Sequence, residues 1–186
     1  MLLGEGFFLK KSFIIAAITA SLLGFGLHFL YDFLPGCLSS LISPVNESVW
    51  EHLKLLFWPT MLAAFFLAGR SENPHRLWAS FFVPLLLMPL FLTGIYYLLL
   101  TGFGVSALWI DIGLYFLTML LGFLLAWLLY NKAQPEKLGA VLLFPLLIYG
   151  ACLILFSFAA PSLEIFTPEG GAAAKIQKFF LNFLCF

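Results

Sequence analysis

Long apolar runs are the feature that most constrains how this chain can fold. Five segments, at residues 12–34, 44–68, 74–100, 106–130 and 137–160, are apolar over most of their length. Each reaches the roughly 20 residues that an α-helix needs to cross a hydrocarbon core of about 30 Å. Charged residues make up 10% of the chain, against about 25% in soluble domains. The sequence therefore predicts an all-α, polytopic transmembrane helical bundle of five spans in the lipid bilayer.

Local signals suggest where two of these helices begin. Ser43-Pro44 and Asn73-Pro74 each place a capping side chain directly before a proline, and proline suits the first turn of a helix. The second and third spans are accordingly predicted to begin at residues 44 and 74. The first apolar run has no small-residue cleavage site at its end, so we interpret it as an uncleaved span and not as a signal peptide.

The basic residues predict the orientation of the bundle, because loops rich in Lys and Arg stay in the cytoplasm. The loops on the opposite side contain none. The N-terminus is therefore predicted to be cytoplasmic and the C-terminus extracytoplasmic, in a multi-pass protein of the cell membrane. The cytoplasmic residues are Lys10, Lys11, Arg70, Arg76, Lys132 and Lys137.

We expect one transmembrane domain over residues 1–160 and an extracytoplasmic tail over 161–186. The tail is irregular at first, and its phenylalanine spacing over residues 172–186 suits a short interfacial helix. Formal net charge is zero, which excludes nucleic acid as a partner because no basic field is available to bind phosphates. Cys152 is expected to pack within a helix, and Cys37 and Cys185 to be free thiols, since no paired spacing links them.

Polar residues are concentrated between Ser43 and Lys54, and this run is where function must be sought. On one helix Glu47, Glu51 and Lys54 would share a stripe, next to a stripe that carries Ser48 and His52. Charges inside spans are costly and tend to face one another. We therefore predict one pocket in the outer half of the membrane, formed by His28, Asp32, Asn46, Glu47, Ser48, Trp50, Glu51, His52, Lys54 and Asp111.

Asp111 is alone in an apolar segment, and its predicted partner is Lys54 or His52. A purely structural interpretation is open as well. A carboxylate is favourable at the start of a helix, as Glu47 would be, and Glu51 can pair with Lys54 at i, i+3.

Two kinds of reactive site are compatible with these residues. His28, Asp32, Glu51 and His52 supply the ligand chemistry of zinc or another divalent metal, although no His-Glu-x-x-His motif is present. Alternatively, Ser48 and His52 at i, i+4 could form a nucleophile and base oriented by Asp32 or Glu51. The sequence does not decide whether the protein is an enzyme.

The run from Pro44 to Lys54, Pro-Val-Asn-Glu-Ser-Val-Trp-Glu-His-Leu-Lys, preceded by His28 and Asp32, resembles the hallmark of an uncharacterised family of small bacterial multi-spanning membrane proteins. The resemblance covers about residues 28 to 60. It implies a membrane location and a shared motif and supplies no chemistry. Membrane-embedded zinc hydrolases of the ceramidase type also use scattered Ser, Asp and His ligands, but their paired histidines at i, i+4 are absent here.

These observations rank three functions. Binding or transport of a small polar or lipid-headgroup ligand comes first, and a transporter with only five spans would have to be a homo-oligomer. A membrane-embedded hydrolase at the outer leaflet, with or without a metal, comes second. A structural or assembly protein comes third.

Overall fold

The computed structural model describes residues 3–132 and 135–167, and all regular structure in these ranges is helical. Four elements are short: α2, α3, the π-helix η1 and the 3-10 helix η2. In chain order the elements are α1 (Leu3–Leu27), α2 (Leu30–Phe33), α3 (Cys37–Ile42), α4 (Val49–Ala68), α5 (Pro74–Tyr97), η1 (Leu98–Gly102), α6 (Leu108–Asn131), α7 (Pro135–Phe158) and η2 (Glu164–Phe166).

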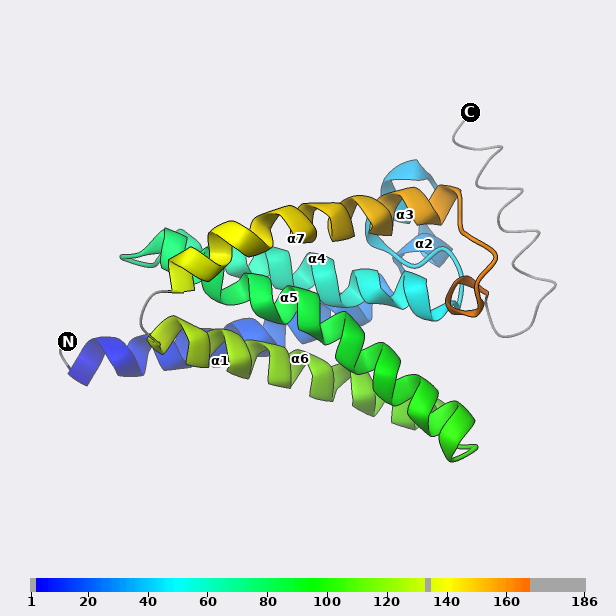
Figure 1. Ribbon diagram of the computed structural model, residues 1–186, viewed down its shortest axis with the longest axis horizontal. Helices are drawn as coiled ribbons and strands as arrows, with labels where there is room; N and C mark the ends of the chain where they lie inside the picture. Colours follow the sequence, from blue (N-terminus) through cyan, green and yellow to red (C-terminus); the bar gives the residue numbers. More distant parts are fainter. Residues whose placement is uncertain (1–2, 133–134, 168–186) are drawn as a thin grey trace.

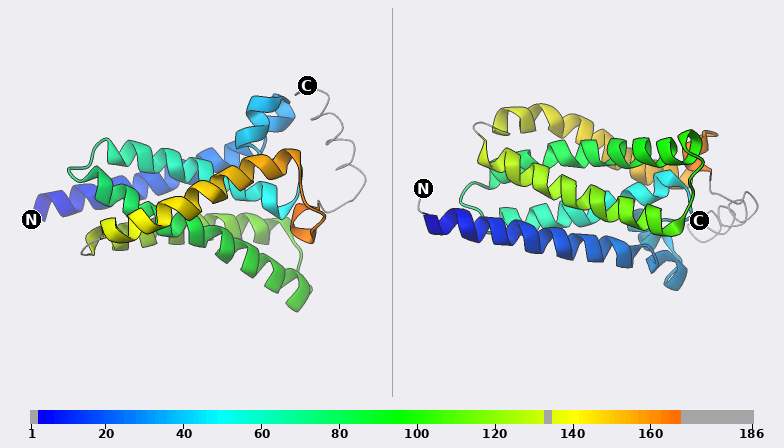
Figure 2. Two further views of the ribbon diagram at one scale, coloured as in Figure 1. Left: turned by 45° about the horizontal axis from the view of Figure 1, so that its top comes forward. Right: turned by 90° about the horizontal axis from the view of Figure 1, so that it is seen from below.

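The five long helices lie roughly along one axis and form an elongated bundle (Figure 1). Helix α5 packs on α6, α7 and α4, and α1 packs on α4 and α6. The shared core is almost wholly apolar, and its most deeply buried side chains include Leu56, Leu77, Phe81, Met119 and Leu153. The start of α1 and the α4–α5 and α6–α7 connections gather at one end of the bundle, while α2, α3 and η2 lie at the other (Figures 1 and 2).

Within the described residues, three helices are long and apolar enough to cross a membrane: Pro74–Gly102, Leu108–Asn131 and Gly139–Phe158, with mean hydropathies of 2.0, 2.2 and 2.5. This is fewer than the five spans predicted. The described apolar part of α1, Lys11–Leu27, is shorter, and α4 carries three polar side chains in its first two turns. The outer faces are nevertheless apolar: Leu90 and Phe144, for example, are 69% and 72% exposed. These features are compatible with a membrane protein.

The first predicted span, 12–34, is interrupted in the structure. Helix α1 ends at Leu27, and the separate turn α2 follows. The Ser43 hydroxyl stabilises the break, because it donates to the Leu27 carbonyl at 2.6 Å and accepts from the Tyr31 amide at 3.1 Å. His28 and Asp32 therefore do not lie on one continuous helix.

The second span was predicted to begin at residue 44, but α4 begins at Val49. Its N-cap is Ser48, whose hydroxyl accepts from the Glu51 amide at 3.4 Å. Asn46 holds the preceding turn, accepting from the Ser48 amide at 2.9 Å. Since Ser43 is extended at the end of α3, residues 43–48 form a loop instead of a first helical turn.

The predictions for the third span, the cysteines and the tail have different outcomes. Helix α5 begins at Pro74 after Asn73, as predicted, although the Asn73 side chain makes no capping bond. Cys152 lies in α7 as a free, partly buried thiol, whereas Cys37, expected to be free, is disulfide-bonded. The predicted interfacial helix over 172–186, and Cys185 within it, lie outside the described residues.

Candidate metal centre

His28, Glu47 and His52 meet at the end of the bundle that is opposite the start of α1. The two imidazole Nε2 atoms are 3.0 Å apart, and Glu47 Oε2 is 3.4 Å from His52 Nε2 and 3.7 Å from His28 Nε2. Each residue thus directs one potential ligand atom at a common point, and all of these atoms lie within 4.8 Å of one another. Glu47 is the most exposed member, with 65% of its side chain accessible against 28% for His28.

These three residues come from three local structures. His28 follows the last residue of α1, Glu47 is in the loop before α4, and His52 is in the first turns of α4. The two helices can approach because Gly24 has no side chain. A Cβ there would lie 2.6 Å from the Leu55 carbonyl oxygen of α4, closer than real contacts allow. The separation between the two histidines is therefore set by a close contact one turn from His28.

The backbone carbonyl of Ser48 fixes the tautomer of the neutral His52 ring. Its Nδ1 lies 2.8 Å from the Ser48 carbonyl oxygen, which can only accept a hydrogen bond, so Nδ1 carries the proton of the neutral ring. In that neutral form the Nε2 lone pair faces His28 and Glu47, whereas in the protonated form Nε2 donates to Glu47. A backbone carbonyl on the far ring nitrogen is the usual arrangement behind a metal-binding histidine.

The electrostatics of the other two groups also suit a cation. Burial lowers the pKa of His28, and the neighbouring His52 lowers it further, outweighing the opposite effects of Glu47 and Asp32. The hydrogen bond with His52 lowers the pKa of the Glu47 carboxyl, against the opposing effect of burial. A neutral imidazole and an ionised carboxylate are the forms that bind metals.

The distances between the three ligand atoms match those between the ligand atoms of a tetrahedral metal site. With Zn–N bonds of about 2.0–2.1 Å, tetrahedral ligand atoms lie about 3.3–3.4 Å apart, and the observed distances of 3.0, 3.4 and 3.7 Å bracket that value. Two nitrogens and one carboxylate oxygen are also an accepted ligand set for zinc.

A second polar cluster lies beside the first and is fully buried. Lys54 Nζ contacts Glu51 Oε2 at 2.7 Å and also donates to the carbonyls of Ser40 and Ser43, at 2.7 and 3.3 Å. Lys54 is 0% exposed and Glu51 is 2% exposed. All three ammonium hydrogens of Lys54 therefore have acceptors, which a buried charge requires.

Both oxygens of the Glu51 carboxylate also accept hydrogen bonds. Besides Lys54 the carboxylate accepts from the Val45 amide at 3.0 Å through Oε2 and from the Ser157 hydroxyl at 2.9 Å through Oε1. It therefore ties α4 to the loop before it and to α7. Sequence reasoning missed Ser157; its one signal was a hydroxyl near the end of an otherwise apolar span.

The predicted contact of Asp111 with Lys54 or His52 stays a prediction. Asp111 lies in the first turn of α6 and is exposed. Among the described residues, Lys54 and His52 form their ion pairs with Glu51 and Glu47. In the first turn of a helix a carboxylate is favoured by the helix dipole.

The remaining predicted pocket residues surround the clusters. Asp32 is exposed on α2, close enough to His28 to raise its pKa. The Ser48 hydroxyl caps α4, and His52 contacts the Ser48 carbonyl instead of that hydroxyl, so the structure forms no serine–histidine pair. Trp50 packs away from the histidines, with its ring centroid 4.9 Å from that of Phe166.

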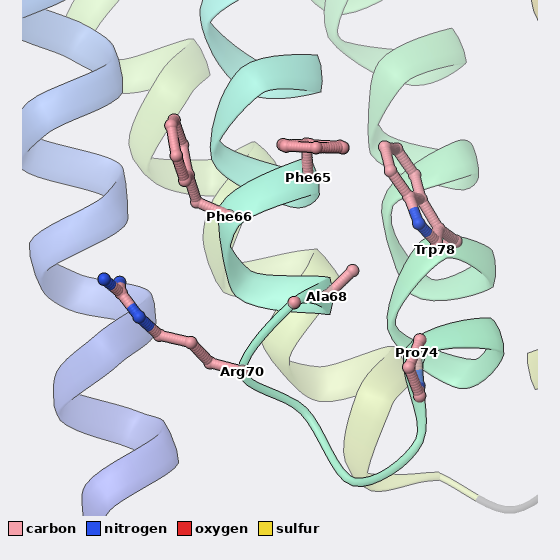
Figure 3. A pocket seen from close by; sticks show the side chains of 7 residues that line it. Phe65, Phe66, Ala68, Arg70, Pro74 and Trp78 are labelled. Atoms are coloured by element: carbon pink, nitrogen blue, oxygen red, sulfur yellow. The ribbon is translucent and has the colours of Figure 1, made fainter.

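A cavity of about 460 Å³ lies at the opposite end of the bundle, between the end of α4 and the start of α5. Its walls are mainly aromatic and aliphatic, and the Arg70 side chain extends away from Trp78 (Figure 3). It contains none of the predicted site residues. The lining residues are Phe65, Phe66, Ala68, Gly69, Arg70, Pro74 and Trp78.

Comparison with known proteins gives one match. The family model DUF6512, described as a family of unknown function, matches residues 7–173 and so includes both polar clusters. No curated protein and no solved structure matches the chain. The predicted resemblance to an uncharacterised family is confirmed to that extent; a bacterial source and a shared motif are not tested.

Proposed function

Because the chain belongs to DUF6512, a family of unknown function, we propose its function from the geometry: it is a membrane protein with a divalent transition-metal site formed by His28, Glu47 and His52. One observation carries this proposal. Three ligand atoms from separate parts of the chain converge at the spacing of a tetrahedral metal site. Two imidazoles and one carboxylate bind both catalytic zinc and non-haem Fe(II), and the tetrahedral spacing of the three ligand atoms favours zinc.

The three ligands found among the described residues support a catalytic site. Structural zinc sites are closed by four protein ligands, whereas catalytic sites have three and keep one position for water or substrate. Glu47 is the exposed member of the set, so the site can be reached from outside the bundle. Asp32 acts on His28 electrostatically and raises its pKa, and in our proposal it would accept a proton beside the open position.

We take metal-assisted hydrolysis at the membrane face as the reaction class. The metal would lower the pKa of its bound water and so supply a nucleophile at neutral pH. This reverses the order of the functions predicted from the sequence. A binding or transport protein was expected to use the Glu47/Glu51 pair and Lys54 for a charged group or a proton. Glu51 and Lys54 satisfy each other and the surrounding backbone, so neither is available to carry a ligand or proton.

We also propose that all five long helices span the membrane, with the N-terminus cytoplasmic and the metal site extracytoplasmic. Helix α4 has 20 residues, about 30 Å at 1.5 Å per residue. The basic connections gather at the end opposite the metal site. Cys37, on α3 at the same end of the bundle as the proposed site, is disulfide-bonded, which fits an oxidising compartment.

Metal analysis of the full-length protein tests the site. Protein purified in mild detergent and dialysed against zinc should retain stoichiometric zinc, and His28→Ala and His52→Ala should lose it. His75→Ala is the matched control, because His75 is exposed at the far end of the bundle. Zinc that is absent from the wild type, or retained equally in all three variants, would refute the proposal.

Cobalt substitution tests the open position. Co²⁺ in a tetrahedral site gives intense visible bands, and azide should change them by occupying the fourth position. Spectra that azide leaves unaltered would indicate four protein ligands and a structural site, which excludes the proposed hydrolysis.

A further inference from the structure

The segment that connects α1 to α3, residues 29–38, exposes an unusual amount of apolar surface. Phe33 and Leu38 are 79% and 82% exposed, and Leu34 and Phe29 are 66% and 43% exposed. Asp32 is the only charged residue between positions 29 and 42. Exposed apolar clusters of this kind mark surfaces that contact a partner or a membrane.

This segment is held in place by buried contacts on its inner side. Tyr31 is 5% exposed, and its amide donates to the Ser43 hydroxyl. Lys54 donates to the carbonyls of Ser40 and Ser43 at the far end of α3. The outward apolar side chains therefore belong to an ordered segment whose inner side is held by hydrogen bonds.

The apolar surface is continuous with the outer face of α1. The Phe25 ring lies 5.7 Å from that of Phe29, and Leu22 and Ile18 on the same helix are 59% and 56% exposed. A face that meets lipid along α1 thus extends past the end of the helix. The partner that fits this continuity is the outer leaflet of the membrane that the helices cross.

The metal centre adjoins the same surface. His28 directly precedes Phe29, and their ring centroids are 5.1 Å apart. His28 follows the end of α1 and Glu47 precedes the start of α4, which places the centre at the level where spans end and lipid headgroups begin. The groups there that are anionic and rich in oxygen are the phosphates of phospholipids.

We propose that residues 29–38 insert into the outer leaflet and that the open position of the metal at His28, Glu47 and His52 takes a phosphate oxygen of a phospholipid headgroup. This inference rests on the proposed metal site. The charge of the metal is essential to it, because Glu47 alone would repel a phosphate and Lys54 is already saturated by Glu51 and two carbonyls. Recognition of the lipid is therefore metal-dependent.

Phosphorus NMR of Co²⁺-loaded, full-length protein in phosphatidylglycerol nanodiscs tests the inference. Paramagnetic Co²⁺ should broaden the lipid ³¹P signal, and azide should remove most of that broadening by displacing the phosphate. The variant Phe33→Ser/Leu38→Ser should keep its cobalt spectrum and show several-fold less broadening. Phe65→Ser is the matched control, since Phe65 is 62% exposed at the opposite end of the bundle, and it should behave as the wild type.

Each failure has a distinct meaning. If no Co²⁺ binds, the metal site itself is refuted. If Co²⁺ binds but azide leaves the ³¹P broadening intact, the metal is only near the headgroups and phosphate coordination is wrong. If inorganic phosphate in detergent alters the cobalt spectrum as strongly as the phospholipid does, or if the double serine variant broadens the signal fully, the role of the leaflet is wrong.

Discussion

Replacing Glu51 by Gln tests whether the buried ion pair acts separately from the proposed metal site. Glu51→Gln keeps the shape of the side chain but removes its charge and one of its two acceptor oxygens. Lys54 would then remain buried with two neutral carbonyls. Removing one partner of a buried pair costs about 3–5 kcal/mol. The hydrogen bonds give a similar figure, since the two at Oε2, from Lys54 and Val45, are bonds to a charged group and contribute about 1.5–3 kcal/mol each.

Lys54→Met should destabilise the fold by a similar amount, because it leaves the carboxylate buried with two neutral donors. The double variant Glu51→Gln/Lys54→Met should be no less stable than either single variant, since removing both charges together is often close to neutral. Unfolding in mixed micelles with increasing dodecyl sulfate, followed by tryptophan fluorescence, measures the three free energies. Glu72→Gln and Lys137→Met are controls at exposed positions and should change stability little.

The metal content of the same variants decides between a ligand and a supporting role for Glu51. Folded Glu51→Gln protein should bind zinc with the wild-type stoichiometry, whereas His52→Ala should bind none. Loss of zinc from folded Glu51→Gln would make Glu51 a ligand and refute the separation of the clusters. Additive destabilisation in the double variant would show that Glu51 and Lys54 do not act as one unit.

Three further predictions follow from particular contacts. Gly24→Ala should weaken zinc binding, because the added methyl group would displace α1 from the Leu55 carbonyl and move His28. Competition with a zinc-responsive dye measures the change in zinc affinity, and an unaltered affinity would contradict the prediction. Ser48→Ala should destabilise the fold by about 1 kcal/mol through loss of the N-cap of α4 without removing zinc, as micelle unfolding and metal analysis would report. In a chain without native cysteines, Asn73→Cys should resist an impermeant thiol reagent in intact cells and react after lysis, whereas labelling in intact cells would reverse the proposed orientation.

The sequence by itself determined the helical class and the approximate extent of the long helices. Apolar periodicity and length are local properties, so residues 74–100, 106–130 and 137–160 could be assigned from the chain alone, and α5, α6 and α7 are confirmed near those positions. The same reasoning placed function near residues 43–54, because charges are costly in an apolar chain. It also indicated the Glu51–Lys54 pair at i, i+3 as a structural alternative.

The start of α4 could also have been found in the sequence. Ser48-x-x-Glu51 has the pattern of a capping box, and it competes with the Ser43-Pro44 signal that was preferred. Helix α4 begins after Ser48 because the Glu51 side chain accepts hydrogen bonds from the Val45 amide and from Lys54. The bond to Val45 requires the residues between Val45 and α4 to form a loop.

Only the tertiary structure decided how the polar residues divide. Helical spacing assigned Glu47 and Glu51 to one stripe, but the loop before α4 turns Glu47 toward His28 while Glu51 turns inward to Lys54 and Ser157. The approach of His28 to His52 spans 24 positions and depends on the close contact at Gly24. No local pattern encodes such distances, because they are set by how whole helices pack, and packing depends on contacts between residues far apart in the chain.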